Sequence, residues 1–420
     1  GLIVGGMRYQ KGRLLKFGPH NGFTNFLVKG LLEDREGNIW FTTDGDGVYK
    51  FSNLAFTSLD STSGLSGNTV SCLALTPTGK LWVSYFDEGM DIWDTKTNKT
   101  LPIPAQLRNK RVNCLAIDNG GNTWVGLAGP GIYKISKTKT EYIPLDAHIS
   151  YQGAILHIQA GKGKEMWIST SNGILLHDGQ KITHFSQKEG LKGRFVRRTL
   201  HLLSGETITS GPRGLNIIRN GLISDFDYDK DLAEFPALSM AQRSDGVLAL
   251  GSFEDGIALF DPKTRKKSYF TVKNGLCSNL IYNTIFDQQG RLWIGTERGI
   301  DLLTIDKSLK ISTVRHFNEA DGFTARETNA NTALFSPDGD LWIGTIKGIF
   351  KYRESGEKAQ ATALKVHFTD VRLPFDTTDL VQYASGKGTW NNVPHELELP
   401  YTKNQLKINY IAINHTHPDH

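Results

Sequence analysis

The strongest constraint on the fold of this chain is an internal repeat that returns every 41 to 49 residues. The unit is clearest in Leu31–Phe51, which predicts a strand, a tight turn at Gly37, a second strand centred on Trp40, a glycine-bearing turn and a third strand. A unit of this size cannot bury its apolar residues alone, so the copies must pack against one another. With Gly37 as the anchor, the equivalent glycines are Gly79, Gly121, Gly163, Gly205, Gly246, Gly290 and Gly339.

Three more columns of residues keep the same period. A second glycine follows each anchor by nine or ten residues, and a small apolar residue precedes it by nine. About three residues after the anchors stand Trp40, Trp82, Trp124, Trp167, Ile208, Ala249, Trp293 and Trp342, which include six of the eight tryptophans. A fixed period with four short strands per unit is typical of a β-propeller. The sequence therefore predicts an all-β fold, a single β-propeller of about eight four-stranded units. Seven units is the alternative if one of them does not join the ring.

The N-terminal region matches the end of a unit rather than its beginning. Arg13–Phe17 followed by Asn21–Asn25 corresponds to Ala55–Leu59 followed by Gly64–Asn68. We therefore expect Arg13–Phe17 to supply the outer strand of the last unit, because circular closure removes free sheet edges. The propeller domain is predicted over residues 1–353, and the first ten residues receive no role.

After Ala361 the period stops. Leu364–Val371 and Gln405–Ile413 alternate as strands, which predicts a separate β-sandwich over residues 361–420. An immunoglobulin-like domain needs about 100 residues. This segment is therefore expected to be only the N-terminal part of one.

The composition excludes several classes of function. The formal net charge is +5, and no basic run or basic helix indicates nucleic-acid binding. No stretch of 18 apolar residues is present and no signal peptide is visible, so the chain is expected to be a fragment that opens inside a repeat.

Cysteine and histidine usage predicts no metal or cofactor. Cys72 and Cys114 occupy the same repeat position and are expected to be buried small hydrophobes rather than a disulfide. The three cysteines form no Cys-x-x-Cys pair, which argues against a zinc or redox centre. The histidines near the C-terminus, His415, His417 and His420, crowd one segment and are not predicted to hold a metal.

Two repeat positions are expected to be structural. Asp34, Asp118 and Asp287 each precede an anchor by three residues, where a carboxylate bonds the N–H groups of a turn. The tryptophans stand in mid-strand in every copy, so they are expected to pack between blades.

The motifs resemble two-component regulator propeller repeats. They are Asp34–Trp40, Gly290–Thr296 and Asp338–Thr345, with Asn274–Asn279 preceding one of them. The tail residues Leu399–Leu406 and Tyr410–Ile413 are similar to the opening of the three-tyrosine immunoglobulin-like domain that follows such propellers.

The resemblance implies the extracytoplasmic ligand-sensing domain of a two-component system sensor histidine kinase. It would lie on the periplasmic side of the bacterial inner membrane and detect a small-molecule or oligosaccharide ligand, in particular one derived from a glycan. The fragment itself would not be an enzyme. The resemblance also implies membrane anchoring through a C-terminal part outside this chain, and a homodimer in the full-length receptor. A propeller enzyme of lyase or sialidase type and a protein-interaction platform remain open alternatives.

Propellers usually bind ligands on the face that carries the loops into the innermost strands and the loops between second and third strands. The candidate ligand-binding residues at these positions are Arg111, Arg194, Arg197, Arg198, Arg213, Tyr282, Arg298, Arg326 and Asn329. No catalytic residue is predicted.

Several of these arginines fall in one sector, around the unit anchored on Gly205. Guanidinium groups present paired donors that suit carboxylate or sulfate. We therefore hypothesise an anionic ligand, such as a uronic-acid or sulfated oligosaccharide. Strand alternation sends Arg197 and Arg198 to opposite faces, so only one of the two can point into the axial funnel. The competing hypothesis is that the arginines pair with acids of neighbouring blades.

Overall fold

The computed structural model describes residues 2–4, 7–10, 13–16, 27–34, 38–45, 47–51, 56–86, 89–148, 153–318, 321–354, 366–374, 379–389, 391, 393–403 and 405–412. The chain divides into two compact units, Gly1–Phe26 with Asn53–Glu354 and Leu27–Ser52 with Ser355–His420. Each unit is described by itself.

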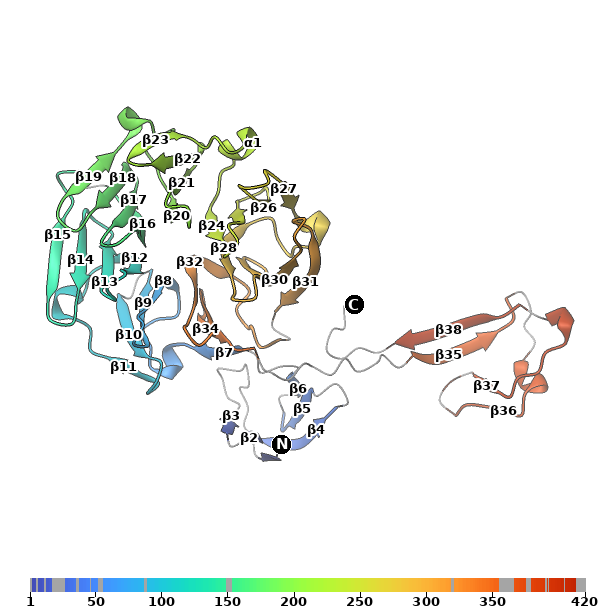
Figure 1. Ribbon diagram of the computed structural model, residues 1–420. Coiled ribbons are helices and arrows are strands. Elements are labelled where there is room, and N and C mark those ends of the chain that lie inside the picture. Colours follow the sequence, from blue (N-terminus) through green and yellow to red (C-terminus); the bar gives the residue numbers. More distant parts are fainter. Residues whose placement is uncertain are drawn as a thin grey trace. The chain divides into compact units, whose positions relative to one another are not determined.

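The described residues of the first unit form seven four-stranded antiparallel sheets, arranged as the blades of a ring (Figure 1). The innermost strand of each blade contacts that of the next, and the last inner strand, β32 (Thr328–Phe335), contacts the first, β8 (Val70–Leu75). The predicted β-propeller is therefore confirmed. Its ring has seven blades, the number predicted from the sequence as the alternative to eight.

Six blades are simple meanders of four consecutive strands. The first blade contains β8, β9 (Lys80–Tyr85), β10 (Met90–Asp94) and β11 (Lys99–Leu101). The second contains β12 (Val112–Ile117), β13 (Thr123–Leu127), β14 (Gly131–Ile135) and β15 (Thr140–Pro144). The third contains β16 (Ile155–Ala160), β17 (Met166–Thr170), β18 (Gly173–His177) and β19 (Ile182–Phe185). The fourth blade contains β20 (Arg198–His201), β21 (Thr207–Gly211), β22 (Gly214–Arg219) and β23 (Leu222–Asp225). The fifth contains β24 (Ser239–Gln242), β25 (Leu248–Gly251), β26 (Ile257–Phe260) and β27 (Lys267–Phe270). The sixth contains β28 (Ile281–Phe286), β29 (Leu292–Thr296), β30 (Gly299–Ile305) and β31 (Ile311–Phe317). A four-residue helix, α1 (Lys230–Ala233), lies between β23 and β24.

The seventh blade closes the ring. It contains β32, β33 (Leu341–Thr345) and β34 (Gly348–Tyr352), and its outer strand is β7 (Phe56–Leu59), which pairs with β34. The prediction that Arg13–Phe17 would close the ring is wrong.

The segment β3 (Arg13–Lys16) pairs instead with β2 (Met7–Gln10), which also pairs with β1 (Leu2–Val4). The physical reason is connectivity. Because β7 leads through a single loop into β8, closure on β7 joins the last blade to the first without leaving a repeat between them.

In the second unit the first repeat forms a separate three-stranded sheet of β4 (Val28–Glu33), β5 (Ile39–Thr43) and β6 (Val48–Phe51). The ring thus lies within the predicted 1–353 domain, and the boundaries of that domain stay a prediction.

In the tail, β35 (Val366–Arg372) pairs antiparallel with β38 (Lys407–Ala412), where the sequence predicts two strands. A shorter pair joins β36 (Gly386–Lys387) to β37 (Pro394–His395). The immunoglobulin-like assignment of residues 361–420 stays a prediction. Among the helices that the structure describes, none combines the length and apolar character needed to span a membrane.

Five of the six repeated tryptophans are buried in the blades, as predicted, whereas Trp40 in the separate three-stranded sheet is half-buried. Trp124 is 1% exposed and Trp293 is 2% exposed, and Trp293 stacks on Phe317 with ring centroids 5.3 Å apart. The turn aspartates also have the predicted structural role, since Asp118 accepts from the N–H groups of Gly120 and Asn122. Asp118 additionally accepts from Trp124 Nε1 at 3.0 Å, which ties each such turn to its own blade core.

Cys72 and Cys114 are free and buried, as predicted. Burial raises the pKa of the Cys72 thiol to about 11, so this thiol stays protonated and inert at neutral pH. Its Sγ accepts from the N–H of Leu115 on the neighbouring blade at 3.2 Å.

Within the described residues, three of the loops that lead into inner strands begin with the same single-turn 3-10 helix. These helices are η2 (Ser61–Ser63), η4 (Gln187–Glu189) and η5 (Val272–Asn274), each with a reciprocal capping box at its start. Each ends on a glycine in the left-handed region, with φ of +98° at Gly275. The Asn-Gly-Leu motif around Gly275 therefore marks the end of a capped turn that only glycine terminates without strain.

Candidate functional site

The candidate residues lie at one end of the blades, which we call the top face. It is formed by the loops into the inner strands and the loops between second and third strands, which meet at the same end because successive strands run in opposite directions. The sector around β20 carries four of the predicted arginines.

Arg197 is held between two aromatic rings. Its guanidinium carbon lies 4.6 Å from the ring centroid of Phe253 and 5.7 Å from that of Phe195. Phe195 belongs to the loop before β20, and Phe253 to the loop joining β25 and β26 of the next blade. The rings are 37% and 43% exposed, so their edges and outer faces reach solvent. Partial burial lowers the pKa of Arg197, which remains charged.

Arg198 takes a different direction. It is the first residue of β20, and burial lowers its pKa to about 10. Its charge acts on Cys72 of β8 and on His157 of β16. Because β8 lies across the ring from β20, this coupling places the guanidinium toward the ring interior. His157 Nδ1 is buried there without a hydrogen-bond partner in the described part of the chain.

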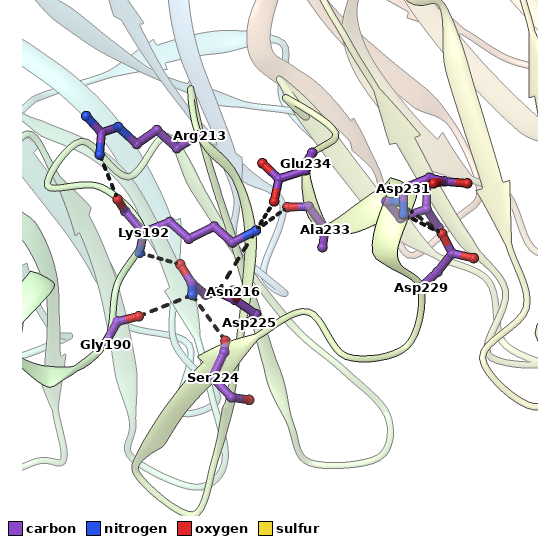
Figure 2. Close-up of polar contacts among 11 residues, drawn as sticks. Gly190, Lys192, Arg213, Asn216, Ser224, Asp225, Asp229, Asp231, Ala233 and Glu234 are labelled. Carbon is purple, nitrogen blue, oxygen red and sulfur yellow. Dashed lines mark hydrogen bonds and ion pairs between the residues drawn. The ribbon is translucent and has the colours of Figure 1, made fainter.

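Arg213 lies on the loop joining β21 and β22 and is exposed. Its Nη1 donates only a long hydrogen bond, 3.5 Å, to the carbonyl of Lys192. Figure 2 shows the guanidinium pointing away from the nearby acidic residues, which form ion pairs with Lys192 instead. Lys192 Nζ lies 2.8 Å from Glu234 Oε1 and 4.0 Å from Asp225 Oδ1. Arg194, in the same loop as Lys192, is also exposed.

The loop that carries Lys192 is held by hydrogen bonds to Asn216. Asn216 on β22 accepts from the Lys192 N–H at 3.0 Å and donates to the carbonyls of Gly190 and Ser224, as Figure 2 shows. These bonds hold the loop that also carries Arg194 against β22.

The structure separates the other candidates from this sector. Tyr282 donates to Glu327 at 3.2 Å, and Arg298 lies 3.6 Å from Glu297. Asn329 donates to the carbonyl of Val70 at 2.6 Å, so it joins the last blade to the first and is structural.

Arg326 and Arg111 lie in exposed loop positions. Arg111 lines a cavity of about 740 Å³ between the first two blades, together with Arg108, Lys110 and Phe86. This cavity is a basic concavity on the top face, apart from the β20 sector.

The arginines of the β20 sector and those at the other end of the blades differ in their ion pairing with carboxylates. In the described residues, no carboxylate lies within ion-pair distance of Arg194, Arg197, Arg198 or Arg213. The opposite end of the blades carries the loops between first and second strands and the ends of the third strands. The arginines that pair with carboxylates at that end are Arg219, Arg243, Arg291 and Arg353. The hypothesis that the β20-sector arginines pair with acids of neighbouring blades is therefore not supported.

Sequence reasoning missed Phe195 and Phe253. Both stand in loops, where an apolar residue has no periodic signal, and they come from different repeats. The available signal was their position, since each lies in one of the two loops that build the top face.

Comparison with known proteins agrees with the repeat motifs. Residues 275–298 match the family model described as two component regulator propeller, which confirms the predicted resemblance at this repeat. The matched segment begins at the glycine that ends η5 and runs to the loop after β29. No curated protein sequence matches the chain.

Solved structures with the same fold include two extracellular domains from B. thetaiotaomicron. The extracellular domain of BT3049, described as a hybrid two component system, is 20% identical with a TM-score of 0.71, over 94% of this chain and 54% of that one. The extracellular domain of BT4673, described in the same way, is 18% identical with a TM-score of 0.59, over 96% and 57%. The chain thus spans about half the length of these domains.

Virginiamycin B lyase from Staphylococcus aureus is 15% identical with a TM-score of 0.57, over 70% of this chain and 98% of that one. At such identities the likeness extends to the fold.

Proposed function

We propose that this chain is the sensor propeller of an extracytoplasmic domain in a two-component system sensor histidine kinase. The family-model match at residues 275–298 and the shared fold with extracellular domains of such systems support this proposal. In the whole protein, the propeller would lie on the periplasmic side of the inner membrane. Membrane anchoring beyond this chain and a homodimeric receptor belong to the same proposal.

The ligand that the top face fits best is an anionic oligosaccharide derived from a glycan. The observation that carries this choice is the set of β20-sector arginines without carboxylate partners among the described residues. A guanidinium group offers two parallel donors that match a carboxylate or sulfate.

Beside these charges, Phe195 and Phe253 present partly exposed rings, which supply apolar contact area with little conformational entropy to lose. The combination suits a charged sugar, whose C–H groups can pack on an aromatic ring, better than a neutral or purely apolar ligand.

The test is isothermal titration of the chain with acidic and neutral oligosaccharides of matched length. We expect binding of the acidic series, weakened at least about tenfold in Arg194→Ala and Arg197→Ala, which corresponds to about 1.4 kcal/mol. Lys181→Ala is the matched control, because it removes one exposed cation from a turn at the opposite end of a blade.

A neutral glycan that binds equally to wild type and both arginine variants would contradict the anionic ligand. Cleavage of any oligosaccharide during the titration would favour the lyase or sialidase alternative. Absence of binding across both series would favour the protein-interaction alternative.

A further inference from the structure

A second group of reactive side chains lies in the β28–β31 blade, outside the β20 sector. Cys277 in the loop before β28, Asp301 on β30 and His316 on β31 bring a thiol, a carboxylate and an imidazole together, with their ligand atoms all within 4.8 Å of one another. Asp301 and His316 face each other across the strand pair, and His316 Nδ1 donates to Asp301 Oδ1 at 2.6 Å. Asp301 is fully buried, whereas the His316 side chain is 36% exposed, which leaves a path from solvent.

The repeat supplies an internal comparison for this group. In the first blade, Asp91 occupies the position of Asp301 and accepts from the N–H of Ser66, the residue that corresponds to Cys277. In the fourth blade, Asn216 and Lys192 form the same contact. The polar residue on the third strand therefore fixes the loop before the inner strand in three blades.

That structural role explains Asp301, whose Oδ2 accepts from the Cys277 N–H at 2.9 Å. It does not explain the side chains around it. Asp91 is satisfied by the hydroxyl groups of Ser66 and Tyr85. Only in the β28–β31 blade, among these three, do a thiol and an imidazole flank the same position.

The surroundings of the group are acidic. Glu297, in the loop after β29, belongs to the same end of this blade, and its side chain bonds Ser278, the residue after Cys277. Glu297 Oε1 accepts from Ser278, but Oε2 is buried without a partner in the described residues. A buried carboxylate oxygen without a hydrogen-bond partner favours a cation nearby.

We propose that Cys277, Asp301 and His316 bind a zinc ion at the top of the β28–β31 blade. Thiolate, imidazole and carboxylate are the three ligand types that zinc takes, and three protein ligands leave a fourth position for water or for the Thr296 hydroxyl. Thr296 Oγ1 already lies 3.2 Å from Cys277 Sγ.

The geometry requires only small movements. Tetrahedral zinc holds its ligand atoms roughly 3.3–3.8 Å apart, given bonds of about 2.0–2.3 Å. His316 Nδ1 and Asp301 Oδ1 must therefore separate by about 1 Å. The metal takes the place of the Nδ1 proton, and the neutral imidazole then carries its proton on Nε2. Binding also releases the thiol proton of Cys277, so zinc affinity should rise with pH.

The test uses the full chain in a reducing buffer, titrated with zinc by calorimetry and with Co²⁺ by absorption spectroscopy. We expect a single zinc ion per chain and a thiolate-to-cobalt charge-transfer band in wild type. Cys277→Ala should abolish that band, and Cys277→Ala and His316→Gln should each weaken zinc binding by more than about 100-fold, since even outer-shell changes cost 10–100-fold. Circular dichroism checks that both variants fold.

His184→Gln is the matched control. His184 on β19 pairs with Leu175 at the same register at which His316 pairs with Asp301, but no carboxylate stands opposite it. We expect this variant to bind zinc like wild type. Zinc binding that survives both Cys277→Ala and His316→Gln would place the metal on other histidines and overturn the proposal. Absence of stoichiometric binding to wild type would show that Asp301 and His316 form only an ion pair.

Discussion

The six repeated tryptophans differ in whether their indole N–H group finds a partner. Where an aspartate stands six residues before the tryptophan, as with Asp34, Asp118 and Asp287, its carboxylate accepts from Nε1. Where Thr76, Gly161 or Ser336 takes that place, the indole nitrogen is buried without a partner in the described residues. A buried donor without a partner costs roughly 1–3 kcal/mol.

Thr76→Asp should therefore stabilise the protein. The new carboxylate would accept from Trp82 Nε1 and from the Lys80 N–H, which now bonds the Thr76 hydroxyl. We expect a gain of about 1 kcal/mol in the free energy of unfolding, measured as a higher urea midpoint. Thr100→Asp adds the same charge at an exposed position on β11 of the same blade and should leave the midpoint unchanged. Equal midpoints for the two variants would mean that the indole is satisfied in another way.

Truncation of the buried tryptophans should be costly. Trp124→Ala and Trp293→Ala remove rings that are almost fully buried, and each should cost about 3–5 kcal/mol of stability. Neither ring reaches the top face, so ligand affinity at a temperature where the variants are folded should be unchanged. Trp124→Phe, which keeps most of the apolar area, should lose much less in the same urea titration. Wild-type stability in the alanine variants would refute the packing role of this column.

His157 should make the protein sensitive to acid. Burial holds the pKa of this imidazole well below its usual value of 6.5, so the folded chain keeps it neutral while the unfolded chain takes up a proton. Stability due to this group is therefore complete above pH 6.5 and falls as the pH drops below it, by up to about 1.4 kcal/mol per pH unit. His157→Gln should flatten the dependence of the urea midpoint between pH 6.5 and about pH 5, whereas His184→Gln should not.

At the scale of elements, the repeat predicts the blades well and the closing strand poorly. The anchor glycines and tryptophans fix the first three strands of each blade, because each column has one geometric role. Arg13–Lys16 and Phe56–Leu59 carry the same outer-strand pattern, so the pattern alone cannot select which one pairs with β34. The number of blades in the ring depends on the packing angle between neighbouring blades. Residues of every blade contribute to this angle, so no single segment predicts it.

The candidate site was predicted only in part for a similar reason. The loops of the top face follow from strand order, so the positions of Arg194, Arg197 and Arg213 could be found. The direction of each side chain depends on the neighbouring blade, as with Arg197, which Phe253 of the next blade holds. The group of Cys277, Asp301 and His316 was also missed, because its ligands come from three separate segments without a short motif.

At the scale of the whole molecule, the closing pair of β7 and β34 should be decisive for stability. A chain of residues 53–354 retains both strands and should unfold cooperatively, like the ring in the full chain. A chain of residues 61–354 lacks β7 and leaves β34 as an open edge, so amide exchange in Gly348–Tyr352 should accelerate. Exchange rates that match between the two fragments would show that the ring does not depend on this pair.

The same pairing sets a delay during synthesis. About 290 residues separate β7 from β34, so the ribosome makes the closing strand long before the strand that it must meet. At about 5–20 residues per second this interval lasts roughly 15–60 s. Throughout that time β7 is an unpaired strand and the growing stack of blades keeps an exposed edge. The nascent chain therefore cannot close its ring until the last blade has been translated.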